Sequence, residues 1–483
     1  MKVNLFRRYI WYKTKERQDI MLQRAEIEQL LPENGESFDV IIAGGGPAGI
    51  GAALAAVTNG AKTLILEDRA FFGGVASVSG WMPINRLYID GSSRGDIHEM
   101  FISKLRALSP DACCPGRISW FEGEKLHLHL DDEPIPPGIY NQMLDVDGLH
   151  IHPDYLRLGV LELLEETGCY YLLRSPVTGV EMNGNSITSV VCDGKFGRKT
   201  YSASVYVDAS GDGDVAFYAG AQMHKGREND GYFMPATLGF VIANVDEDRL
   251  FTAQSKIGFG EFANLIKSAA SKGYATSTFY SFDKTTVPGV VSVNNSGQMG
   301  LGIVDATDLR DVNLSLRTGL QVAMDFVKIV REKKLPGLEN CHLVRTGSEL
   351  GIRETRRIVG DYVLTLEDTQ ENREFGDTVA RRYGTIDTGG LREEKNVHGS
   401  IQNGHAYPYR CMLPQGLDGL LVAGRCASLT HTALTICKSM GNMMAIGAAA
   451  GVAAALSAKE GVYPRDLDIN KLQNRLRKMK VPI

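Results

Sequence analysis

The chain has 483 residues, more than one hydrophobic core usually supports, so two interleaved domains are expected. Its hydrophobic content of 43% and charged content of 23% are ordinary for a soluble globular protein. The net charge of −5 gives no reason to expect a nucleic-acid partner. No apolar run approaches the length that spans a bilayer, so membrane association is not expected either.

Residues 1–36 form an N-terminal extension that is basic near its start. It lacks a continuous apolar segment with a small-residue cleavage site, so a cytoplasmic protein is predicted rather than a secreted one. From Lys15 to Leu31, apolar residues recur among charges as they do in an amphipathic helix. We expect this helix to pack on the protein surface or on a second subunit of a homo-oligomer; a helix lying on a membrane is the alternative.

The most informative stretch is residues 38–68, where two apolar runs flank a glycine-rich turn and a small-residue helix. This order of strand, turn, helix and strand is that of a dinucleotide-binding βαβ unit. Gly44 permits the tight turn, Gly46 lets the backbone approach a pyrophosphate, and Gly49 lets the helix pack against the strand. Glu67 ends the second strand, where its carboxylate can accept hydrogen bonds from a ribose. The chain is therefore predicted to bind a dinucleotide.

Residues 153–225 continue this organisation. A helix is expected over residues 153–166, closed by Gly168. Short strands with hairpin turns at Asn183-Gly184 and Asp193-Gly194 follow at 169–173, 177–182, 187–192 and 201–207. The last of these strands runs into Ser210-Gly211-Asp212, a second glycine and acid turn.

The residue pattern of the remaining chain changes at two places. Residues from about 225 to 340 lose the βαβ rhythm and read as a mixed insertion, with a helix over 314–333. A buried strand then ends at Gly424, and a long helix rich in alanine and glycine opens at Met440. The start of this helix is either an anion or carbonyl site or a region of close helix packing.

The eight cysteines are sparse and show no metal-ligand spacing, so reduced thiols and no metal site are predicted. Cys113 and Cys114 are adjacent in an expected loop, where a coincidence is favoured over redox chemistry. Two histidine pairs, at residues 127 and 129 and at 150 and 152, alternate as on strands. Neither pair has an evident third ligand, so both are interpreted as structural.

Several of these motifs together resemble a known family. They are Gly44 to Gly49 and residues 207–214, 351–361, 408–410 and 421–426. The chain resembles the FAD-dependent oxidoreductases whose FAD domain is shared with p-hydroxybenzoate hydroxylase and the fumarate reductase flavoproteins. More narrowly, it is similar to the family related to the flavin subunit of heterodisulfide reductase, from about residue 37 to the end.

The resemblance implies an α/β fold. A discontinuous Rossmann-like FAD-binding domain, with a parallel sheet and a β-meander, would comprise residues 37–225 and 401–483, the latter ending in a helix. Residues 226–400 would be mostly an inserted, mixed α+β substrate domain.

The resemblance also implies a set of FAD contacts. The pyrophosphate would lie on the first glycine turn, the adenosine ribose on Glu67 beside Asp68, and the adenine on the backbone of Val177. The residues expected near the cofactor are Gly44, Gly46, Pro47, Ala48, Gly49, Glu67, Asp68, Gly73, Gly74, Val177, Ser210, Gly211, Asp212, Gly424, Arg425, Gly441, Asn442 and Met443. The N–H groups of the last three would face the pyrimidine edge of the flavin. Arg425 departs from the hydroxylase branch, where an aspartate binds the ribityl chain.

The sequence narrows the reaction type. Ala76 and Trp81 stand where disulfide reductases carry their redox cysteines, which excludes dithiol chemistry at that site. A second glycine fingerprint is absent, so electrons come from a substrate, a transiently bound nicotinamide or a redox partner protein. The preferred reading is a dehydrogenase or reductase that moves a hydride between flavin and a small organic molecule. A flavin-dependent monooxygenase and an electron-relay subunit are the alternatives.

Catalytic candidates follow from the need for an acid or base and for cations near the substrate. Arg353 and Arg357 would share one face of a helix, from which one of them could reach an anionic substrate or the flavin. His431 and His398 are acid/base candidates, with His431 preferred because it lies between the flavin strand and the flavin helix. Arg410 is expected to anchor the substrate.

Overall fold

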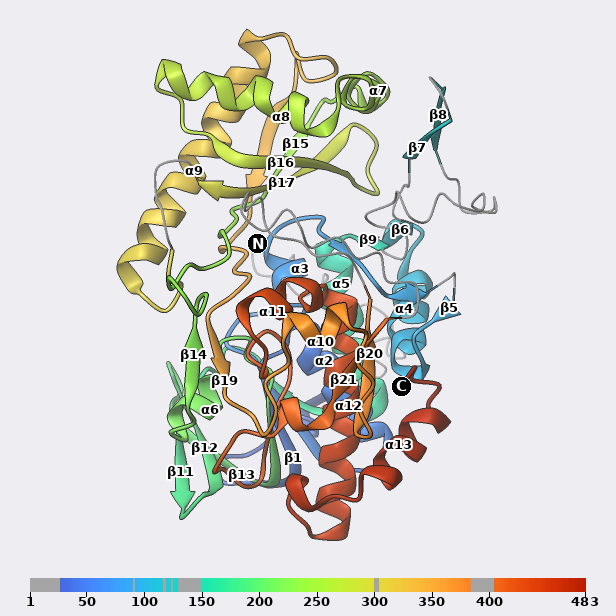
Figure 1. The fold of residues 1–483 in the computed structure, drawn as a ribbon, viewed down its shortest axis with the longest axis vertical. Helices are drawn as coiled ribbons and strands as arrows, with labels where there is room; N and C mark the ends of the chain where they lie inside the picture. The colour runs from blue at the N-terminus through green and yellow to red at the C-terminus, as the bar shows by residue number, and fades with distance from the viewer. Residues whose placement is uncertain are drawn as a thin grey trace, which may run out of the picture.

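The computed structural model describes residues 27–89, 92–115, 119–122, 125–128, 149–298, 304–383 and 404–483. Within them the chain forms a larger lobe, drawn at the bottom of Figure 1, and a smaller lobe above it. The expected amphipathic helix at residues 15–31 lies mostly outside the described residues, and of it only residues 27 and 28 are seen as helical.

The larger lobe is built on a sheet in the order β10-β2-β1-β13, with β22 on the other side of β13. These strands pair in parallel: Ile42 lies opposite Ile65 and Val207, and Val207 lies opposite Leu421. Beyond its parallel half, β13 continues into an antiparallel meander with β12 and β11. The expected α/β fold with a parallel sheet and a β-meander is therefore confirmed. The bounds are β1 Ser37–Ala43, β2 Thr63–Leu66, β10 Tyr170–Leu172, β11 Val177–Asn183, β12 Ser186–Gly194, β13 Gly197–Asp208 and β22 Leu420–Val422.

This strand order creates a switch point between β1 and β13. From β1 the chain crosses to β2 and β10 on one side, whereas β13 and β22 lie on the other. In open parallel sheets a ligand binds at such a point, beyond the carboxyl ends of the strands. Those ends are Ala43, Leu66, Asp208 and Val422.

Two helices poor in large side chains, α2 (Pro47–Thr58) and α12 (Met440–Glu460), pack in close contact against each other. A Cβ on Gly447 would lie 1.9 Å from the Ala48 carbonyl oxygen, and one on Gly451 would lie 2.1 Å from that of Ala52. Close packing thus explains the glycines of α12. By length and composition α12 is apolar enough to cross a membrane, which the sequence analysis did not anticipate, yet 89% of its most apolar window is buried.

Helix α5 (Pro153–Thr167) confirms the expected helix, and Gly168 ends it in the left-handed conformation with φ of 74°. The Cys113–Cys114 pair is in a short strand, β6 (Cys113–Pro115), rather than in the expected loop. It pairs with β9 (Leu149–Ile151), so backbone pairing, which its local sequence does not signal, sets its conformation.

The smaller lobe has its own hydrophobic core, centred on residues such as Phe240, Phe282 and Phe326. Its sheet has the order β16-β17-β15-β18, covered by α7, α8 and α9. This core ends at Cys341, and later residues such as Leu364 and Val379 join the core of the larger lobe, so the second core is shorter than the expected 226–400 insertion. The bounds are β15 Phe240–Ala243, α7 Glu247–Ile257, α8 Phe259–Lys267, η2 Ser268–Lys272, β16 Ser277–Lys284, β17 Val290–Gln298, α9 Leu309–Glu332 and β18 His342–Thr346.

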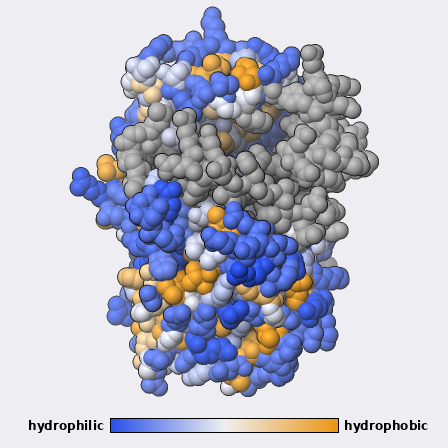
Figure 2. All heavy atoms as spheres, viewed as in Figure 1, coloured by the Kyte–Doolittle hydropathy of each residue, from blue (hydrophilic) through white to orange (hydrophobic). Residues whose placement is uncertain are grey.

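The remaining helices and strands complete the described structure. They are α3 Val75–Val78, β3 Pro83–Ile84, β4 Tyr88–Ile89, β5 Ser92–Ser93, α4 Asp96–Leu108, β7 Ser119–Glu122, β8 Lys125–Leu128, α6 Asp214–Tyr218, β14 Met223–Lys225, β19 Arg356–Ile358, α10 Leu366–Gln370, β20 Thr378–Arg382, β21 His405–Pro408, η4 Tyr409–Met412, α11 His431–Cys437, η5 Pro464–Asp466 and α13 Ile469–Lys478. Where it is coloured, the face seen in Figure 2 is mostly hydrophilic, with hydrophobic residues in small patches.

Candidate functional site

The first glycine turn, after β1, divides its glycines between packing and access. Gly44 has φ of +99°, and a Cβ there would lie 2.4 Å from the Ala209 carbonyl oxygen. A Cβ on Gly49 would lie 1.7 Å from the Gly44 carbonyl oxygen. Gly46 is different, because the nearest atom to a Cβ there is the Gly74 Cα at 3.9 Å. Gly44 and Gly49 therefore hold the turn together, while Gly46 leaves room for a ligand.

A second pair of glycines lies against this turn. The Gly73 N–H donates a hydrogen bond to the Gly45 carbonyl oxygen at 2.8 Å. A Cβ on Gly74 would lie 3.0 Å from the Gly46 Cα. Pro47 begins α2 directly after Gly46, so the first turn of this helix, which includes Ala48, opens at the same place. Helix N-termini carry N–H groups without intrahelical partners, which suits a pyrophosphate.

Glu67, at the end of β2, is tied to the first glycine turn. Its Oε2 accepts a hydrogen bond from the Gly45 N–H at 2.6 Å, and its Oε1 accepts one from the Arg69 N–H at 2.9 Å. Burial and the neighbouring Asp68 charge raise the pKa of Glu67 to about 8, although Arg69 opposes them. The sequence predicted a ribose contact for Glu67, but it did not reveal that the same carboxylate also fixes the glycine turn.

Asp68 follows Glu67 directly in the chain, whereas Val177 comes near Glu67 through the fold. The Ser175 N–H donates to the Glu67 carbonyl oxygen at 2.8 Å, which brings the start of β11 beside the end of β2. Val177 opens β11 two residues later. The side chain of Asp68 is 55% exposed and pairs with Arg69. The predicted adenosine end of the cofactor site is thus assembled from two strands.

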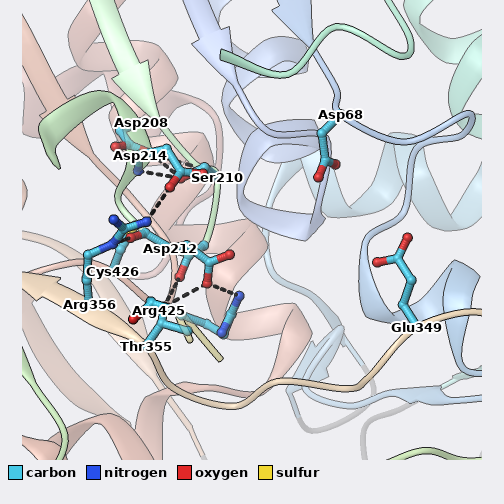
Figure 3. A network of polar contacts seen from close by, with 12 residues as sticks. Asp68, Asp208, Ser210, Asp212, Asp214, Glu349, Thr355, Arg356, Arg425 and Cys426 are labelled. Atoms are coloured by element: carbon cyan, nitrogen blue, oxygen red, sulfur yellow. Dashed lines mark hydrogen bonds and ion pairs between the residues drawn. The ribbon is translucent and has the colours of Figure 1, made fainter. Parts of the chain in front are cut away.

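The second turn, after β13, is organised by buried Asp208 (Figure 3). One oxygen of Asp208 accepts hydrogen bonds from the Ser210 N–H and hydroxyl, and the other accepts one from the Ala216 N–H at 2.9 Å. Burial raises the pKa of the Asp208 carboxyl, and these hydrogen bonds oppose that rise. Asp208 therefore shapes the loop that carries Ser210, Gly211 and Asp212.

Arg425, which follows Gly424 after β22, reaches this second turn. Its Nη2 pairs with Asp212 Oδ1 at 2.9 Å, and a Cβ on Gly211 would lie 2.7 Å from that nitrogen. Thr355 donates its hydroxyl to the same Asp212 oxygen at 2.7 Å. Arg425 thus lies against the second glycine turn, and its guanidinium engages a carboxylate of the protein; its expected place near the cofactor stays a prediction.

Arg356 also joins the second turn, although the sequence analysis assigned it no role. It donates to the Asp212 carbonyl oxygen at 2.8 Å and pairs with the Asp214 carboxylate. Burial and the charges of Asp208 and Asp212 raise the pKa of Asp214 to about 7, against the opposing charge of Arg356.

The start of α12 is closed by contacts within the protein. The Gly441 N–H donates to the Asn85 carbonyl oxygen at 3.0 Å, and the Met443 N–H donates to that of Ser439 at 3.0 Å. The Asn442 side chain is completely buried, and its Oδ1 accepts a hydrogen bond from Arg94 at 2.7 Å. Two of the three expected N–H donors thus have protein partners. Their role toward a flavin stays a prediction.

Residues 351–357 are not helical as expected: residues 352–355 have no regular secondary structure, and Arg356 and Arg357 open β19. Arg353 and Arg357 therefore do not share a helix face: Arg353 Nη1 donates to the Pro235 carbonyl oxygen and the Thr237 hydroxyl, both at 2.6 Å. Arg357 is completely buried and donates to the carbonyl oxygens of Leu429 and Gly226, each at 2.8 Å. Arg357 is thus used in structural contacts.

His431 is enclosed rather than open to a substrate. Its side chain is completely buried, with Nδ1 2.7 Å from Oε2 of Glu354, which also pairs with Arg357. The backbone N–H of His431 donates a hydrogen bond to the Glu228 carboxylate at 2.9 Å. An enclosed imidazole cannot touch a substrate in this conformation, so the expected direct acid/base role is not supported.

The last two catalytic candidates are Arg410 and His398. Arg410 is on the surface, where it pairs with Asp377 at 3.0 Å and lies 5.1 Å from the ring of Tyr362. The ion pair with Asp377 compensates the positive charge of Arg410, so no substrate anion is required there. His398 lies outside the described residues.

Two partners of the candidate site residues come from distant positions that no sequence pattern marks. Arg94, which binds Asn442, and Glu228, which binds the Arg357 side chain, belong to no recognisable motif. For Thr355 and Arg356 the sequence does give a signal of a role at the site, because both lie inside the 351–361 motif. Among the described residues, no group of three or more histidine, cysteine or acidic side chains is arranged to hold a metal ion.

The family model described as FAD dependent oxidoreductase matches residues 39–476. The 4-oxocyclohex-2-ene-1-carboxylate 5-dehydrogenase of Sinomonas cyclohexanicum is 30% identical over 122 residues, which cover 24% of this chain and 19% of that enzyme. The 6-methylpretetramide 4-monooxygenase of Streptomyces rimosus is 27% identical over 190 residues, covering 37% and 40%. Each match spans less than half of the relative's own length.

Among solved structures, a geranylgeranyl bacteriochlorophyll reductase-like protein from Thermoplasma acidophilum superposes with a TM-score of 0.45 at 14% identity, covering 92% of this chain and 83% of that one. The family match confirms the expected cofactor, FAD. The glycine turns fit this cofactor, because the space beside Gly46 and the carboxylate of Glu67 lie where a pyrophosphate and a ribose are needed.

Proposed function

Because the chain belongs to the FAD-dependent oxidoreductase family, we propose that this enzyme is a dehydrogenase or reductase that transfers a hydride between FAD and a small organic substrate. FAD, when bound, supplies the hydride acceptor or donor. The protein supplies a cradle for the cofactor at the switch point and a second lobe that encloses a substrate.

The observation that carries this proposal is the attachment of the smaller lobe to the segment after Gly73–Gly74. The Ser348 N–H donates to the Val78 carbonyl oxygen at 2.9 Å, and a Cβ on Gly347 would lie 3.1 Å from that oxygen. A lobe with its own core, docked beside the cofactor loop, favours an enzyme with its own substrate over an electron relay.

Among the catalytic candidates, we assign positioning roles to two. Arg353 lies in the chain that returns from the smaller lobe and holds Pro235 and Thr237 of the outgoing chain. His431 and Glu354 fix α11 against this same segment. Each residue thus acts on the geometry between the lobes rather than on the reacting atoms.

The monooxygenase remains a second candidate, because the match to 6-methylpretetramide 4-monooxygenase is longer than the match to the dehydrogenase. The position of Arg425 favours the dehydrogenase or reductase. Relatives in the hydroxylase branch use an aspartate there for the ribityl chain, whereas here the guanidinium is paired with Asp212.

The experiment that tests the proposal follows the flavin absorption of the holoprotein under anaerobic conditions. It is mixed with cyclic ketones, alcohols and carboxylic acids, and separately with NADH and NADPH. Bleaching by an organic compound alone, with one oxidised product per flavin, supports a dehydrogenase; reoxidation of reduced flavin by an unsaturated compound supports a reductase. Reduction only by a nicotinamide nucleotide, followed by incorporation of oxygen into a product, would establish the monooxygenase instead.

A further inference from the structure

The contact between the lobes brings charged and aromatic side chains together beside the cofactor loop. A Cβ on Gly80 would lie 2.9 Å from Val241 Cγ2, so β15 of the smaller lobe touches the segment just after α3. Arg345 of β18 is the register partner of Val241. Residues opposite each other in an antiparallel pair share one face of the sheet. Arg345 is therefore on the face that meets Gly80 and, next in the chain, Trp81.

Arg157 approaches the same place from the larger lobe. Its Nη2 donates to the Ser77 carbonyl oxygen at 2.6 Å, and its guanidinium carbon lies 3.9 Å from the centre of the Phe71 ring. Nη1 pairs with Asp154 at 2.8 Å. The side chain of Asp154 is 62% exposed and that of Arg157 only 25%, so solvent weakens this ion pair from the side of the acid. The Arg157 Nε is buried, and no residue in the described part of the chain accepts a hydrogen bond from it. This guanidinium thus has one donor that the described protein groups do not use.

Trp81 and His152 form the apolar side of this region. Their rings lie 4.6 Å apart in an edge-to-face arrangement, and Tyr155 packs 5.1 Å from His152. Trp81 is 9% exposed, and its indole N–H has no hydrogen-bond partner among the described residues. Buried indole N–H groups normally find an acceptor, so this donor points to a ligand that is absent from the protein itself.

Two acids and two arginines act electrostatically on His152 in this region. Arg345 has no ion pair or hydrogen bond to any described residue, and its positive charge lowers the pKa of both His152 and Arg157, in each case adding to burial. Two guanidinium groups close enough to perturb each other are unfavourable without an anion between them. The acids that face His152 are Asp154 and Asp111. Asp154 already pairs with Arg157, whereas no acid among the described residues pairs with Arg345.

We propose that Arg157 and Arg345 bind the carboxylate of an organic acid substrate, whose hydrocarbon part packs on Trp81. This inference rests on the proposed function, because it places the substrate between the lobes and beside the loop that carries Gly73 and Gly74. Guanidinium groups match the planar carboxylate through paired hydrogen bonds, and the tryptophan ring matches a flat hydrocarbon. The substrate class is therefore a small carboxylic acid with a ring or an unsaturated chain.

Binding without turnover tests the site. The holoprotein is titrated with benzoate and cyclohexanecarboxylate, and with neutral benzamide, while tryptophan fluorescence and flavin absorption are recorded. The two acids are expected to bind and benzamide to bind much more weakly. Arg345→Gln should weaken acid binding by roughly ten- to a hundredfold, the range for hydrogen bonds to charged groups. Arg310→Gln is the matched control, because Arg310 is exposed on α9 of the same lobe and should leave binding unchanged.

One further variant and one further ligand sharpen the outcome. Arg157→Lys keeps the charge but loses the planar fork, so it should also weaken acid binding. Failure of both acids to bind, equal binding of benzamide, or unchanged affinity in Arg345→Gln would overturn the site. A tenfold loss of NADPH affinity in Arg345→Gln with unchanged benzoate affinity would overturn it too, because the arginine would then serve a nucleotide phosphate. None of these results requires flavin reduction, so they leave the proposed hydride transfer to its own experiment.

Discussion

His431 Nδ1 lies 2.7 Å from Glu354 Oε2, and both side chains are completely buried. Glu354 also pairs with Arg357, and its Oε2 accepts a hydrogen bond from the Met234 N–H at 3.2 Å. One carboxylate therefore joins α11, the chain that leaves for the smaller lobe and the chain that returns from it. The 351–361 motif is interpreted as a structural connection between the lobes and the second cofactor turn.

This arrangement predicts that Glu354→Ala lowers the free energy of unfolding by about 3–5 kcal/mol, because it leaves buried Arg357 without one of its charge partners. Glu354→Gln should cost less, because its amide oxygen can still accept a hydrogen bond. Urea unfolding of each purified variant measures the effect. The control is Glu371→Gln, whose exposed pair with Arg373 should contribute less than about 1 kcal/mol. A Glu354→Ala protein as stable as this control would contradict the assignment.

The glycine turn predicts a variant that folds but loses its cofactor. Gly46→Val should fold, because a Cβ there meets nothing nearer than 3.9 Å, and it should be purified without flavin because the side chain fills the pyrophosphate space. Absorption near the flavin bands and circular dichroism check the two expectations. Gly49→Ala is the contrasting variant: its Cβ would lie 1.7 Å from the Gly44 carbonyl oxygen, so the fold itself should be damaged. A yellow Gly46→Val protein would sink the cofactor assignment at this turn.

The sequence was sufficient for the first βαβ unit because every requirement there is local. A turn with positive φ at Gly44, close approach at Gly49 and an acid at the end of β2 all fall within residues 38–68. The meander was predictable for the same reason, since alternation and hairpin turns act over short distances. Asp193 and Gly194, expected in the turn, are the last residues of β12, and Gly194 pairs with Gly197 of β13, which is a small shift at a strand end.

The 351–357 segment could not be predicted from its own residues. The spacing of Arg353 and Arg357 suits a helix, but Thr355 binds Asp212 and Arg357 binds the Gly226 carbonyl oxygen, and both partners are distant in sequence. Such tertiary contacts override a weak local preference. The enclosure of His431 was hidden for the same reason, because Glu354 approaches it from another part of the chain.

The carboxylate of Glu67 predicts a pH dependence of stability. Its pKa of about 8 in the folded protein is above the ordinary 4.5, so the folded state binds this proton more tightly than the unfolded state. The free energy of unfolding should therefore fall as the pH rises between these two values, by at most about 1.4 kcal/mol per pH unit. Glu67→Gln should flatten this dependence, whereas Glu99→Gln, on the exposed face of α4, should retain it.

Urea unfolding from pH 5 to 8 measures this slope on protein stripped of flavin, because bound flavin stabilises the native state by mass action. A slope that is the same in Glu67→Gln as in the unchanged protein would show that other groups, such as Asp214 with its pKa of about 7, govern the dependence.

The contact between α2 and α12 predicts that a single methyl group on Gly447 is destabilising. Its carbon would lie 1.9 Å from the Ala48 carbonyl oxygen, which is backbone and cannot rotate away, so Gly447→Ala must push the two helices apart. Overpacking of this kind costs about 1–3 kcal/mol. Gly260→Ala makes the same chemical change in α8, where nothing lies within 4 Å, and the better helix propensity of alanine should stabilise by about 0.5–1 kcal/mol. Opposite signs in urea unfolding are therefore expected for the two variants. Because α2 begins at the pyrophosphate turn, Gly447→Ala should also weaken flavin retention, and a variant that is destabilised yet retains flavin fully would show that the turn does not depend on this helix contact.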